Sequence, residues 1–258
     1  MIIKVATWNV NSIKARLERA LAWLEKAEPN VVCLQELKVT DEDFPADELA
    51  EAGYHAAVHG QRTYNGVAIL SRDEITDVSS GMGDGVKDPQ ARVVRAKTYG
   101  IDVVSVYVPN GREVGSDKWE YKLKWFQRFH KYLDRTFSNG GRLAIGGDFN
   151  VAPEDRDVAN PDKWRESVLC HEGGREKLKD LIHWGLVDTV RIHNDEDGPY
   201  SWWDYRRLAF PKGDGLRIDH ILATKKLAQK CVDAYVDRDE RKGKKPSDHA
   251  PVIAEFEI

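Results

Sequence analysis

Cysteine is scarce in this chain of 258 residues, since only Cys33, Cys170 and Cys231 occur and they lie far apart. Their odd number and the lack of a Cys-x-x-Cys pair argue against a disulfide framework and a structural zinc site. Long apolar runs are lacking too, because a run such as residues 31–34 is far shorter than the ~18 residues that span a bilayer. No charged leader precedes an apolar block at the start, so we expect no signal peptide, no membrane partner and a cytoplasmic location.

An excess of positive charge is also missing. The 39 Lys and Arg residues against 43 Asp and Glu residues give a formal net charge of -4, which argues against a protein that coats nucleic acid through bulk charge. An enzyme that acts on nucleic acid is not excluded, because it can combine a local basic rim with acids around a metal ion. The chain has no low-complexity tract and no Pro/Ser-rich linker, so we expect one domain over residues 1–258.

Hydrophobic periodicity predicts more strands than helices. A strand over residues 2–8, a helix from Ile13 to Pro29 and a strand over 31–35 form an opening β-α-β unit. Further helices are predicted over residues 118–137 and 175–184. The other predicted strands, several of them in hairpins, are residues 54–58, 66–71, 75–79, 92–99, 101–108, 142–146, 217–223 and 251–256. This pattern favours an α/β fold of packed sheets flanked by helices over a doubly wound parallel sheet.

Polar residues follow several of the apolar strands, at the point where each strand ends. They lie in residues 8–11, 34–36, 107–111, 147–150 and 217–220 with 247–251. Strand ends that meet at one edge of a sheet hold side chains rigidly and leave room for a substrate. Residues two apart in an extended strand point the same way, so Asn9 can act with Asn11 and Asp148 with Asn150. The segments 5–11 and 145–151 also resemble each other, a weak sign of internal duplication.

These segments supply groups that suit hydrolysis of a phosphodiester. Four carboxylates are hard oxygen ligands for Mg²⁺ or Mn²⁺, namely Glu36, Asp148, Asp219 and Asp248. A carboxylate next to a histidine would favour the charged imidazolium, which donates well to a phosphate oxygen. Each polar residue alone is more often a turn former or a helix cap, but five such motifs in one chain are hard to explain as turns.

Together these motifs resemble the exonuclease III family of DNA-repair nucleases, within the endonuclease/exonuclease/phosphatase superfamily. The resemblance covers essentially the whole chain, from residues 6–11 to residues 247–251. The intermediate matches are residues 34–36, 64–68, 107–111, 147–153, 184–188 and 217–219. The segments 107–110, 184–188 and 203–206 narrow the resemblance to the exonuclease III branch.

The resemblance implies a four-layered α/β sandwich with two central mixed β-sheets flanked by helices. It implies a Mg²⁺-dependent hydrolase, with Mn²⁺ as a substitute, that cuts DNA on the 5′ side of an abasic site and leaves a 3′-hydroxyl. Exonuclease activity in the 3′→5′ direction and cleaning of 3′ ends on duplex DNA are implied as well. The expected partner is double-stranded DNA with abasic sites or 3′ ends, and the expected oligomeric state is a monomer.

Residue roles are implied where the motifs match. Glu36 resembles the principal metal ligand, and the ligands beside it are Asn9, Asn11 and Asp248. Asp148 resembles the residue that activates or orients the attacking water. The other catalytic residues that the resemblance implies are Tyr107, Asn110, Asn150, Asp219 and His249. Asp219 would pair with His249, and the other four would contact the water or the scissile phosphate.

Contacts with DNA are implied outside the catalytic set. Backbone contacts are expected at Lys14, Tyr64, Arg92 and Arg112. An apolar pocket for an extruded abasic sugar is expected at Trp202, Trp203 and Leu216. Alternation along a strand prevents both tryptophans from facing that pocket equally, so one of them is expected in the core. The basic segment 238–245 is a candidate phosphate contact, although a charge run is more often a solvated loop.

Two other functions stay open on the sequence. One is a superfamily enzyme with another substrate, such as a phosphoinositide phosphatase, a sphingomyelinase-like enzyme or an RNA deadenylase, which the tryptophan pocket disfavours. The other is a nucleic-acid-binding module that has lost catalysis, which the presence of Glu36, Asp148, Asn150, Asp219 and His249 disfavours.

Overall fold

Two mixed β-sheets of six strands each form the centre of the computed structural model, which describes residues 1–258. The strand order of the first sheet is β11 (Cys231–Val236), β12 (Val252–Glu257), β1 (Ile2–Asn9), β2 (Val31–Gln35), β4 (Val67–Ser71) and β3 (His55–His59). The order of the second is β5 (Thr76–Ser80), β6 (Val93–Thr98), β7 (Ile101–Tyr107), β8 (Leu143–Asp148), β10 (Asp219–Thr224) and β9 (Leu186–Asp188).

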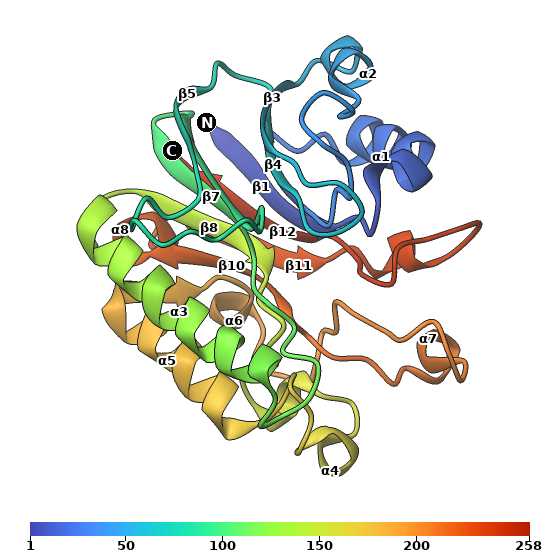
Figure 1. Ribbon diagram of the computed structural model, residues 1–258. Helices are drawn as coiled ribbons and strands as arrows, with labels where there is room; N and C mark the ends of the chain where they lie inside the picture. The colour runs from blue at the N-terminus through green and yellow to red at the C-terminus, as the bar shows by residue number, and fades with distance from the viewer.

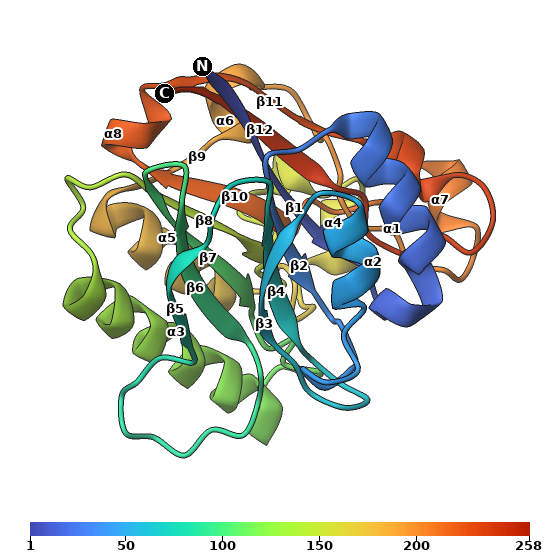
Figure 2. The same ribbon diagram turned by 90° about the horizontal axis from the view of Figure 1, so that it is seen from above.

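Helices cover the outer face of each sheet. Helices α1 (Ile13–Ala27) and α2 (Ala46–Glu51) lie on the first sheet, and α3 (Asp117–Thr136) and α5 (Glu172–Gly185) lie on the second (Figures 1 and 2). The remaining helices are short: η1 (Asp155–Asp157), α4 (Pro161–Trp164), α6 (Val190–His193), α7 (Ala209–Lys212), α8 (Lys225–Ala228) and η2 (Arg238–Arg241). None combines the length and the apolarity that crossing a membrane requires. The four layers confirm the predicted sandwich.

Alternation along the central strands builds the layers. In β1, Ile3 and Val5 belong to the core between the two sheets, whereas Ala6 and Trp8 belong to the core under α1 and α2. Because successive side chains of a strand point to opposite faces, a strand that is apolar on both faces can pack in two cores at once. The same holds for the second sheet, where a third core lies under α3 and α5.

The two sheets are built on the same plan. In the first, β12, β1, β2 and β4 pair antiparallel, parallel and antiparallel in turn, and β10, β8, β7 and β6 do the same in the second. The similar segments noted in the sequence fall on the corresponding strands β1 and β8. Each of these strands is followed by an Asn with left-handed backbone, Asn11 at φ 47° and Asn150 at φ 50°. The architecture therefore supports an internal duplication.

Every predicted strand is present, with its ends shifted by no more than two residues. The prediction missed strands β9 and β11, helix α2 and the other short helices, which are η1, α4, α6, α7, α8 and η2. Helix α2 has six residues and β9 has three, which is too short for a periodicity signal. Strand β11 lies at the edge of its sheet, is mostly exposed and changes register between Cys231 and Asp233, so it lacks a clean alternation.

Strand register brings the polar strand ends together. Asp148 pairs with Tyr107 of β7 on one side and with Asp219 of β10 on the other. The sheets also approach closely at Gly146, where a Cβ would lie 3.0 Å from Cys33 and 3.2 Å from Thr7 Cβ. This absence of a side chain lets the end of β8 meet the end of β1 across the interface between the sheets.

Candidate active site

Asp148 lies at the centre of the polar cluster and is 1% exposed. Its Oδ2 accepts a hydrogen bond from Asn9 Nδ2 of the other sheet at 2.9 Å, and its Oδ1 accepts from the Asn150 backbone N–H at 2.8 Å. Burial, and then the nearby Asp219 carboxylate, raise the pKa of Asp148 to about 7, although His249 and Asn9 favour its ionised form. A carboxylate with a pKa near neutrality is suited to act as a general base.

Asn9 holds two carboxylates of the cluster in place. Its Nδ2 donates to Asp148 at 2.9 Å and to Glu36 Oε1 at 3.0 Å. Its Oδ1 accepts from the Asn11 backbone N–H at 3.0 Å, which fixes the orientation of the amide. This bond uses one of the two lone pairs of the oxygen, so Asn9 as a metal ligand stays a prediction.

His249 lies beside Asp148 and forms a close pair with Asp219. Its Nδ1 is 2.9 and 3.0 Å from the two Asp219 carboxylate oxygens, and its Nε2 is 3.8 Å from Asp148 Oδ2. Burial alone would lower its pKa, but the Asp219 and Asp148 carboxylates raise the pKa of His249 to about 10. At neutral pH the ring is therefore an imidazolium whose Nε2–H faces the cluster.

Asp219 is held by a serine that the sequence did not point to. Ser201 Oγ donates to Asp219 Oδ2 at 2.6 Å and accepts from the backbone N–H groups of Ile218 and Asp219, both at 3.1 Å. Asp219 is fully buried, and this set of bonds leaves its carboxylate one orientation. No motif marks Ser201, because a serine before Trp202 is an ordinary loop residue in sequence.

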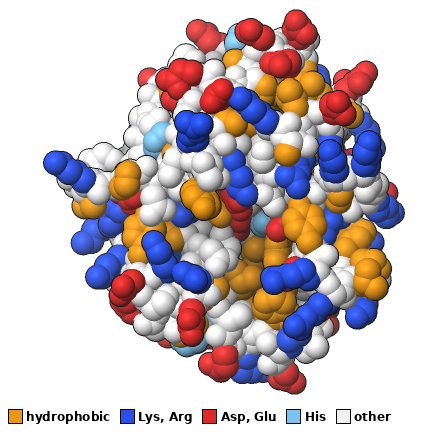
Figure 3. All heavy atoms as spheres, turned by 45° about the vertical axis from the view of Figure 1, so that its right-hand side comes forward, with side chains coloured by type: hydrophobic (Ala, Val, Ile, Leu, Met, Phe, Trp, Pro, Cys, Tyr) orange, Lys and Arg blue, Asp and Glu red, His pale blue; other side chains and the backbone are white.

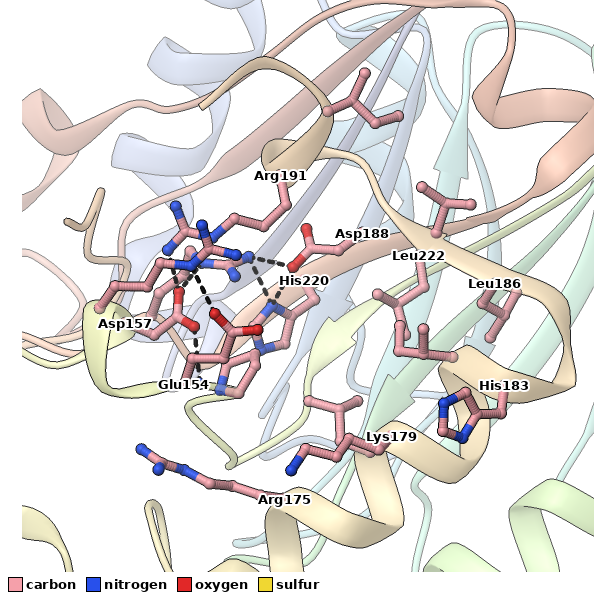
Figure 4. Close-up of a pocket in the computed structure, with 17 residues that line it drawn as sticks. Glu154, Asp157, Arg175, Lys179, His183, Leu186, Asp188, Arg191, His220 and Leu222 are labelled. Carbon is pink, nitrogen blue, oxygen red and sulfur yellow. Dashed lines mark hydrogen bonds and ion pairs between the residues drawn. The ribbon is translucent and has the colours of Figure 1, made fainter. Parts of the chain in front are cut away.

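A buried ionic network supports the start of β10 from behind. Arg217 Nε contacts Asp157 at 2.7 Å, and its Nη1 contacts Asp188 at 2.7 Å and His220 Nδ1 at 3.0 Å. These groups form part of the wall of a pocket of about 370 Å³ next to α5 and α6, away from Asp148 (Figure 4). Burial and the Arg217 guanidinium lower the pKa of His220, so it stays neutral. The network holds Arg217 and His220, which flank Asp219 in the chain.

Glu36 follows β2 and is aimed into the cluster by a left-handed backbone at φ 52°. Its Oε1 accepts from Asn9 and, at 2.9 Å, from the Tyr107 hydroxyl, and its Oε2 lies 2.9 Å from Lys38 Nζ. Burial opposes ionisation, but the Lys38 ammonium and the Asn9 amide outweigh it and lower the pKa of Glu36. Burial and the Glu36 and Asp148 carboxylates raise the pKa of Tyr107 well above its usual value, so its hydroxyl stays a donor.

Asn11 and Asp248 lie on the other side of Glu36. Asn11 Nδ2 donates to Asp248 Oδ1 at 2.8 Å, and Trp202 Nε1 donates to Asp248 Oδ2 at 3.1 Å. Burial opposes ionisation of Asp248, but His249, Asn11 and Trp202 lower its pKa. The carboxylate is therefore ionised and links this part of the cluster to an aromatic side chain.

The donor set fits a hard divalent cation. Carboxylate oxygens of Glu36 and Asp148 and a ring nitrogen of His249 lie within 4.8 Å of one another. The charged His249 cannot offer a lone pair, so the fitting donors are oxygens. Lys38 Nζ lies between Glu36 Oε2 and Asn11 Oδ1, which shows that a positive charge is accommodated there. The Lys38 side chain is 27% exposed and has room to leave.

Asn110 and Asn150 form a separate pair of amides at the edge of the cluster. Asn110 Nδ2 donates to Asn150 Oδ1 at 2.9 Å, and Asn150 Nδ2 donates to the Val108 carbonyl at 3.0 Å. Asn150 is 4% exposed, whereas Asn110 is exposed. Each amide group keeps one N–H free for a ligand, since a side-chain amide nitrogen carries two.

The predicted DNA contacts divide into exposed and buried residues. Lys14, Tyr64 and Arg112 are exposed, as a contact with DNA requires. Arg92 is only 9% exposed: its guanidinium stacks 4.8 Å from the centre of the Tyr107 ring and donates to the Tyr107 carbonyl at 3.0 Å. In this structure Arg92 therefore supports Tyr107, and only a small part of its side chain is exposed for a contact with DNA.

Of the residues predicted to form the apolar pocket, Trp202 is accessible and Leu216 is not. Trp202 is partly exposed and packs edge-on against Trp164, with ring centres 5.7 Å apart. Leu216 is fully buried and pairs with Trp202 through backbone hydrogen bonds, so in this structure it supports Trp202 from below, and its contact with DNA stays a prediction. Trp203 is 1% exposed, which confirms that one of the two tryptophans belongs to the core.

Around the cluster the surface is basic. In Figure 3 acidic and histidine side chains are visible in a hollow, and Lys and Arg side chains surround it. A groove of about 760 Å³ between α1 and the 240–245 segment is lined by Lys14, Lys26, Lys244 and Lys245 among others. Arg19 holds that segment by donating to the carbonyls of residues 242 and 244. The face therefore combines a charged imidazolium, carboxylates and a cationic rim, which suits a phosphate ester.

Comparison with known proteins decides the family. A profile of the endonuclease/exonuclease/phosphatase family matches residues 6–249. The chain belongs to this family. Exodeoxyribonuclease III of Haemophilus influenzae is 35% identical over 266 residues, which cover 98% of this chain and 100% of that protein. The resemblance to the exonuclease III branch is therefore confirmed, and the protein is an enzyme of the hydrolase type found in this family.

Solved structures agree in fold. An AP endonuclease from Archaeoglobus fulgidus is 43% identical, with a TM-score of 0.96 and coverage of 99% of this chain and 100% of that chain. The 3′ phosphatase NExo from Neisseria, solved bound to product DNA hairpin, is 40% identical, with a TM-score of 0.95 and the same coverage. These similarities confirm the four-layered fold along the whole chain.

Proposed function

We propose that this protein is a Mg²⁺-dependent DNA-repair nuclease that hydrolyses the phosphodiester on the 5′ side of abasic sites and leaves a 3′-hydroxyl. The proposal includes 3′→5′ exonuclease activity and removal of blocking groups from 3′ ends of duplex DNA. We further propose that the chain works as a single domain, as a monomer and in the cytoplasm. The observation that supports the chemistry best is the buried Asp219–His249 pair, whose free Nε2 lies 3.8 Å from Asp148 Oδ2.

Asp148 is the proposed base for the attacking water. Its pKa near 7 lets it take a proton from water at neutral pH, and its two hydrogen bonds hold it in one orientation. The water oxygen attacks phosphorus in line as the bond to the leaving 3′ oxygen of the upstream nucleotide breaks. That oxygen must gain a proton to become the 3′-hydroxyl.

The other groups stabilise negative charge on the phosphate. The His249 Nε2–H and one N–H of each of Asn110 and Asn150 are proposed to bind the phosphate, and the hydrogen bonds of these side chains orient them before substrate binds. Donors that are fixed in advance need no reorganisation when charge develops in the transition state. Tyr107 keeps its proton and holds Glu36, and its hydroxyl is close enough to the cluster to serve the leaving oxygen.

Glu36, Asn9, Asn11 and Asp248 are the proposed Mg²⁺ ligands, with water completing the coordination. When bound, the ion neutralises phosphate charge and lowers the energy of the leaving oxygen. Lys38 must then move from its place between Glu36 and Asn11, which its partial exposure allows. Mn²⁺ has the same preference for oxygen ligands and is expected to substitute.

DNA recognition rests on the basic rim and on Trp202. An abasic nucleotide costs less to extrude than a normal one, because it has no base to unstack. Trp202 and Trp164 offer an apolar surface next to Asp248, where the bare sugar can lie. Exposed Lys14, Tyr64 and Arg112 are the proposed backbone contacts. The relatives support the proposed activities at abasic sites and at 3′ ends, since one is an AP endonuclease and another is a 3′ phosphatase.

The test uses two labelled duplexes of one sequence, one with a single abasic-site analogue and one intact with a recessed 3′ end. Each is incubated with and without Mg²⁺, with the wild type and with Asp148→Asn. We expect one Mg²⁺-dependent cut 5′ of the lesion, a slower ladder from the 3′ end, and neither product with Asp148→Asn, which should still bind the abasic duplex. Absence of any cut by folded wild type, with Mn²⁺ also tried, would direct the search to RNA and lipid phosphodiesters.

A further inference from the structure

Lys122 is a fully buried lysine of α3 that lies directly under the Asn110–Asn150 pair. Its Nζ donates three hydrogen bonds, to the carbonyls of Asn110 at 3.1 Å, Asn150 at 2.8 Å and Val168 at 2.6 Å. An ammonium has three donors, so all of them are used, and all of them are used on backbone carbonyls. A charge placed in the interior without a carboxylate partner is costly and needs an explanation.

The three carbonyls come from three different segments. Asn110 follows β7, Asn150 follows β8, and Val168 lies between α4 and α5. Two of these residues carry the amides that face the proposed phosphate site, and their side chains meet at 2.9 Å. Lys122 therefore ties together from below the two loops that the Asn110–Asn150 contact joins from above.

The loops are packed against the lysine and have little freedom of their own. A Cβ on Gly111 would lie 3.1 Å from Lys122 Cδ and 3.2 Å from the Trp119 ring, so the loop backbone rests on these side chains. Asn150 holds a left-handed backbone at φ 50°, a conformation that asparagine adopts more readily than most residues and that the surrounding contacts keep in place here. The Lys122 bond to the Asn150 carbonyl is one of those contacts.

We propose that Lys122 is a positioning residue for phosphodiester cleavage, which holds the Asn110 and Asn150 amides where the scissile phosphate binds. The effect on cleavage rests on the function proposed above. The lysine touches no substrate, and it acts through the carbonyls of the residues that do. Burial lowers the pKa of Lys122 to about 7, while the Asp148 carboxylate opposes the shift.

The test compares Lys122→Met, which removes every donor, with Lys122→Gln, which keeps two. Val168→Ala is the matched control, because it loosens the same cluster and leaves the ammonium in place. Lys118→Met controls for loss of a cation, since Lys118 is exposed on the same helix one turn earlier. For each variant we would measure Tm, kcat and KM on the abasic duplex.

We expect Lys122→Met to lower kcat by about 10–100-fold with KM within about threefold, because a misplaced donor affects the transition state more than binding. Lys122→Gln should recover part of that loss. Val168→Ala should keep kcat within about threefold even where its loss of Tm equals that of Lys122→Met, and Lys118→Met should change neither. If Val168→Ala and Lys122→Met lose kcat equally at equal Tm, Lys122 has only a structural role and the proposal is overturned. If Lys122→Met does not fold, the same criterion is applied to Lys122→Gln.

A second readout separates this proposal from the proposed function. The side-chain amide signals of Asn110 and Asn150 in ¹⁵N–¹H spectra, assigned from their loss in Asn110→Ala and Asn150→Ala, report the position of the amides without any substrate. They should shift in Lys122→Met or Lys122→Gln and stay in place in Lys118→Met. Unchanged signals in the Lys122 variants would overturn the proposal even if the wild type cuts DNA. Shifted signals would uphold the positioning even if the substrate is not DNA.

Discussion

Replacing Asp219 by Asn would remove the charge that faces His249 while keeping the size of the side chain. In the native protein His249 Nδ1 lies 2.9 and 3.0 Å from the two carboxylate oxygens, and Ser201 Oγ donates to one of them at 2.6 Å. An Asn oxygen in the place of Oδ2 keeps both donors, but the amide carries no charge and sets an NH₂ group in the place of Oδ1, 3.0 Å from Nδ1. We expect Asp219→Asn to lower kcat on an abasic duplex by about 10²–10⁴-fold, the usual range for a disrupted proton-transfer or charge-stabilising group.

The stability of the protein should depend on pH through the proton of His249. His249 has a pKa of about 10 in the folded protein, against an ordinary value of 6.5. The contribution of His249 to the free energy of unfolding is complete below about pH 6.5. It is lost as pH rises toward about 10, because in this range the folded protein holds a proton that the unfolded chain has released. One proton is worth about 1.4 kcal/mol per pH unit, so the contribution has an upper limit of about 5 kcal/mol.

Without the Asp219 charge, the pKa of His249 should move toward 6.5. The fall of the unfolding free energy between about pH 6.5 and 9.5 should then be shallower in Asp219→Asn than in the wild type. Urea unfolding at several pH values in this window measures that slope, and kcat is measured on the same samples.

Ser201→Ala is the matched control, because it removes the short hydrogen bond and leaves the carboxylate. Ser201→Ala should keep the wild-type slope of unfolding free energy against pH. Its kcat should fall by less than about tenfold, because the change removes about one ordinary hydrogen bond. The reasoning is refuted if Asp219→Asn shows the slope of the wild type, or if its kcat stays within about threefold of the wild-type value.

Glu36→Gln should raise the Mg²⁺ concentration for half-maximal cleavage by about tenfold or more, and a Mg²⁺ titration that matches the wild type would remove Glu36 from the ligand set. Trp202→Ala should change the ratio of abasic-site cleavage to exonuclease rate, whereas Trp203→Ala should lower Tm by loss of core packing; an unchanged ratio contradicts the pocket assignment. Changing Lys244 and Lys245 to Gln should reduce the slope of log K against log salt by up to about 2 in an anisotropy titration, and an unchanged slope places both outside the DNA contact.

Much of the fold follows from local patterns that the sequence displays. Strand β2 is apolar on both faces, and the helical spacing from Ile13 onward is regular. The Tyr99-Gly100 turn joins two strands that pair as a hairpin. Short or irregular elements could not be predicted, because α2 and β9 have too few residues for a period and β11 alternates poorly.

The residue types of the site were also visible, since Asp148, Asp219 and His249 stand at strand ends in the sequence. What local sequence could not show is the partner of each group. No sequence motif points to Lys38, although its ammonium pairs with Glu36. Ser201 and Lys122 belong to no catalytic pattern either, although Ser201 holds Asp219 and Lys122 holds the Asn110 and Asn150 loops.

The sequence by itself determined the layers, the family and the set of acids, amides and histidine, because these depend on periodicity and on residue identity. Only the tertiary structure decided how those residues behave. The register of β8 between β7 and β10 places Asp148 next to Tyr107 and Asp219, and the close approach of the sheets brings Asn9 to it from the other half. Burial then raises the pKa of Asp148, and the Asp219 pair outweighs burial at His249. Desolvation and pairing depend on neighbours that lie far apart along the chain, so no local pattern encodes them.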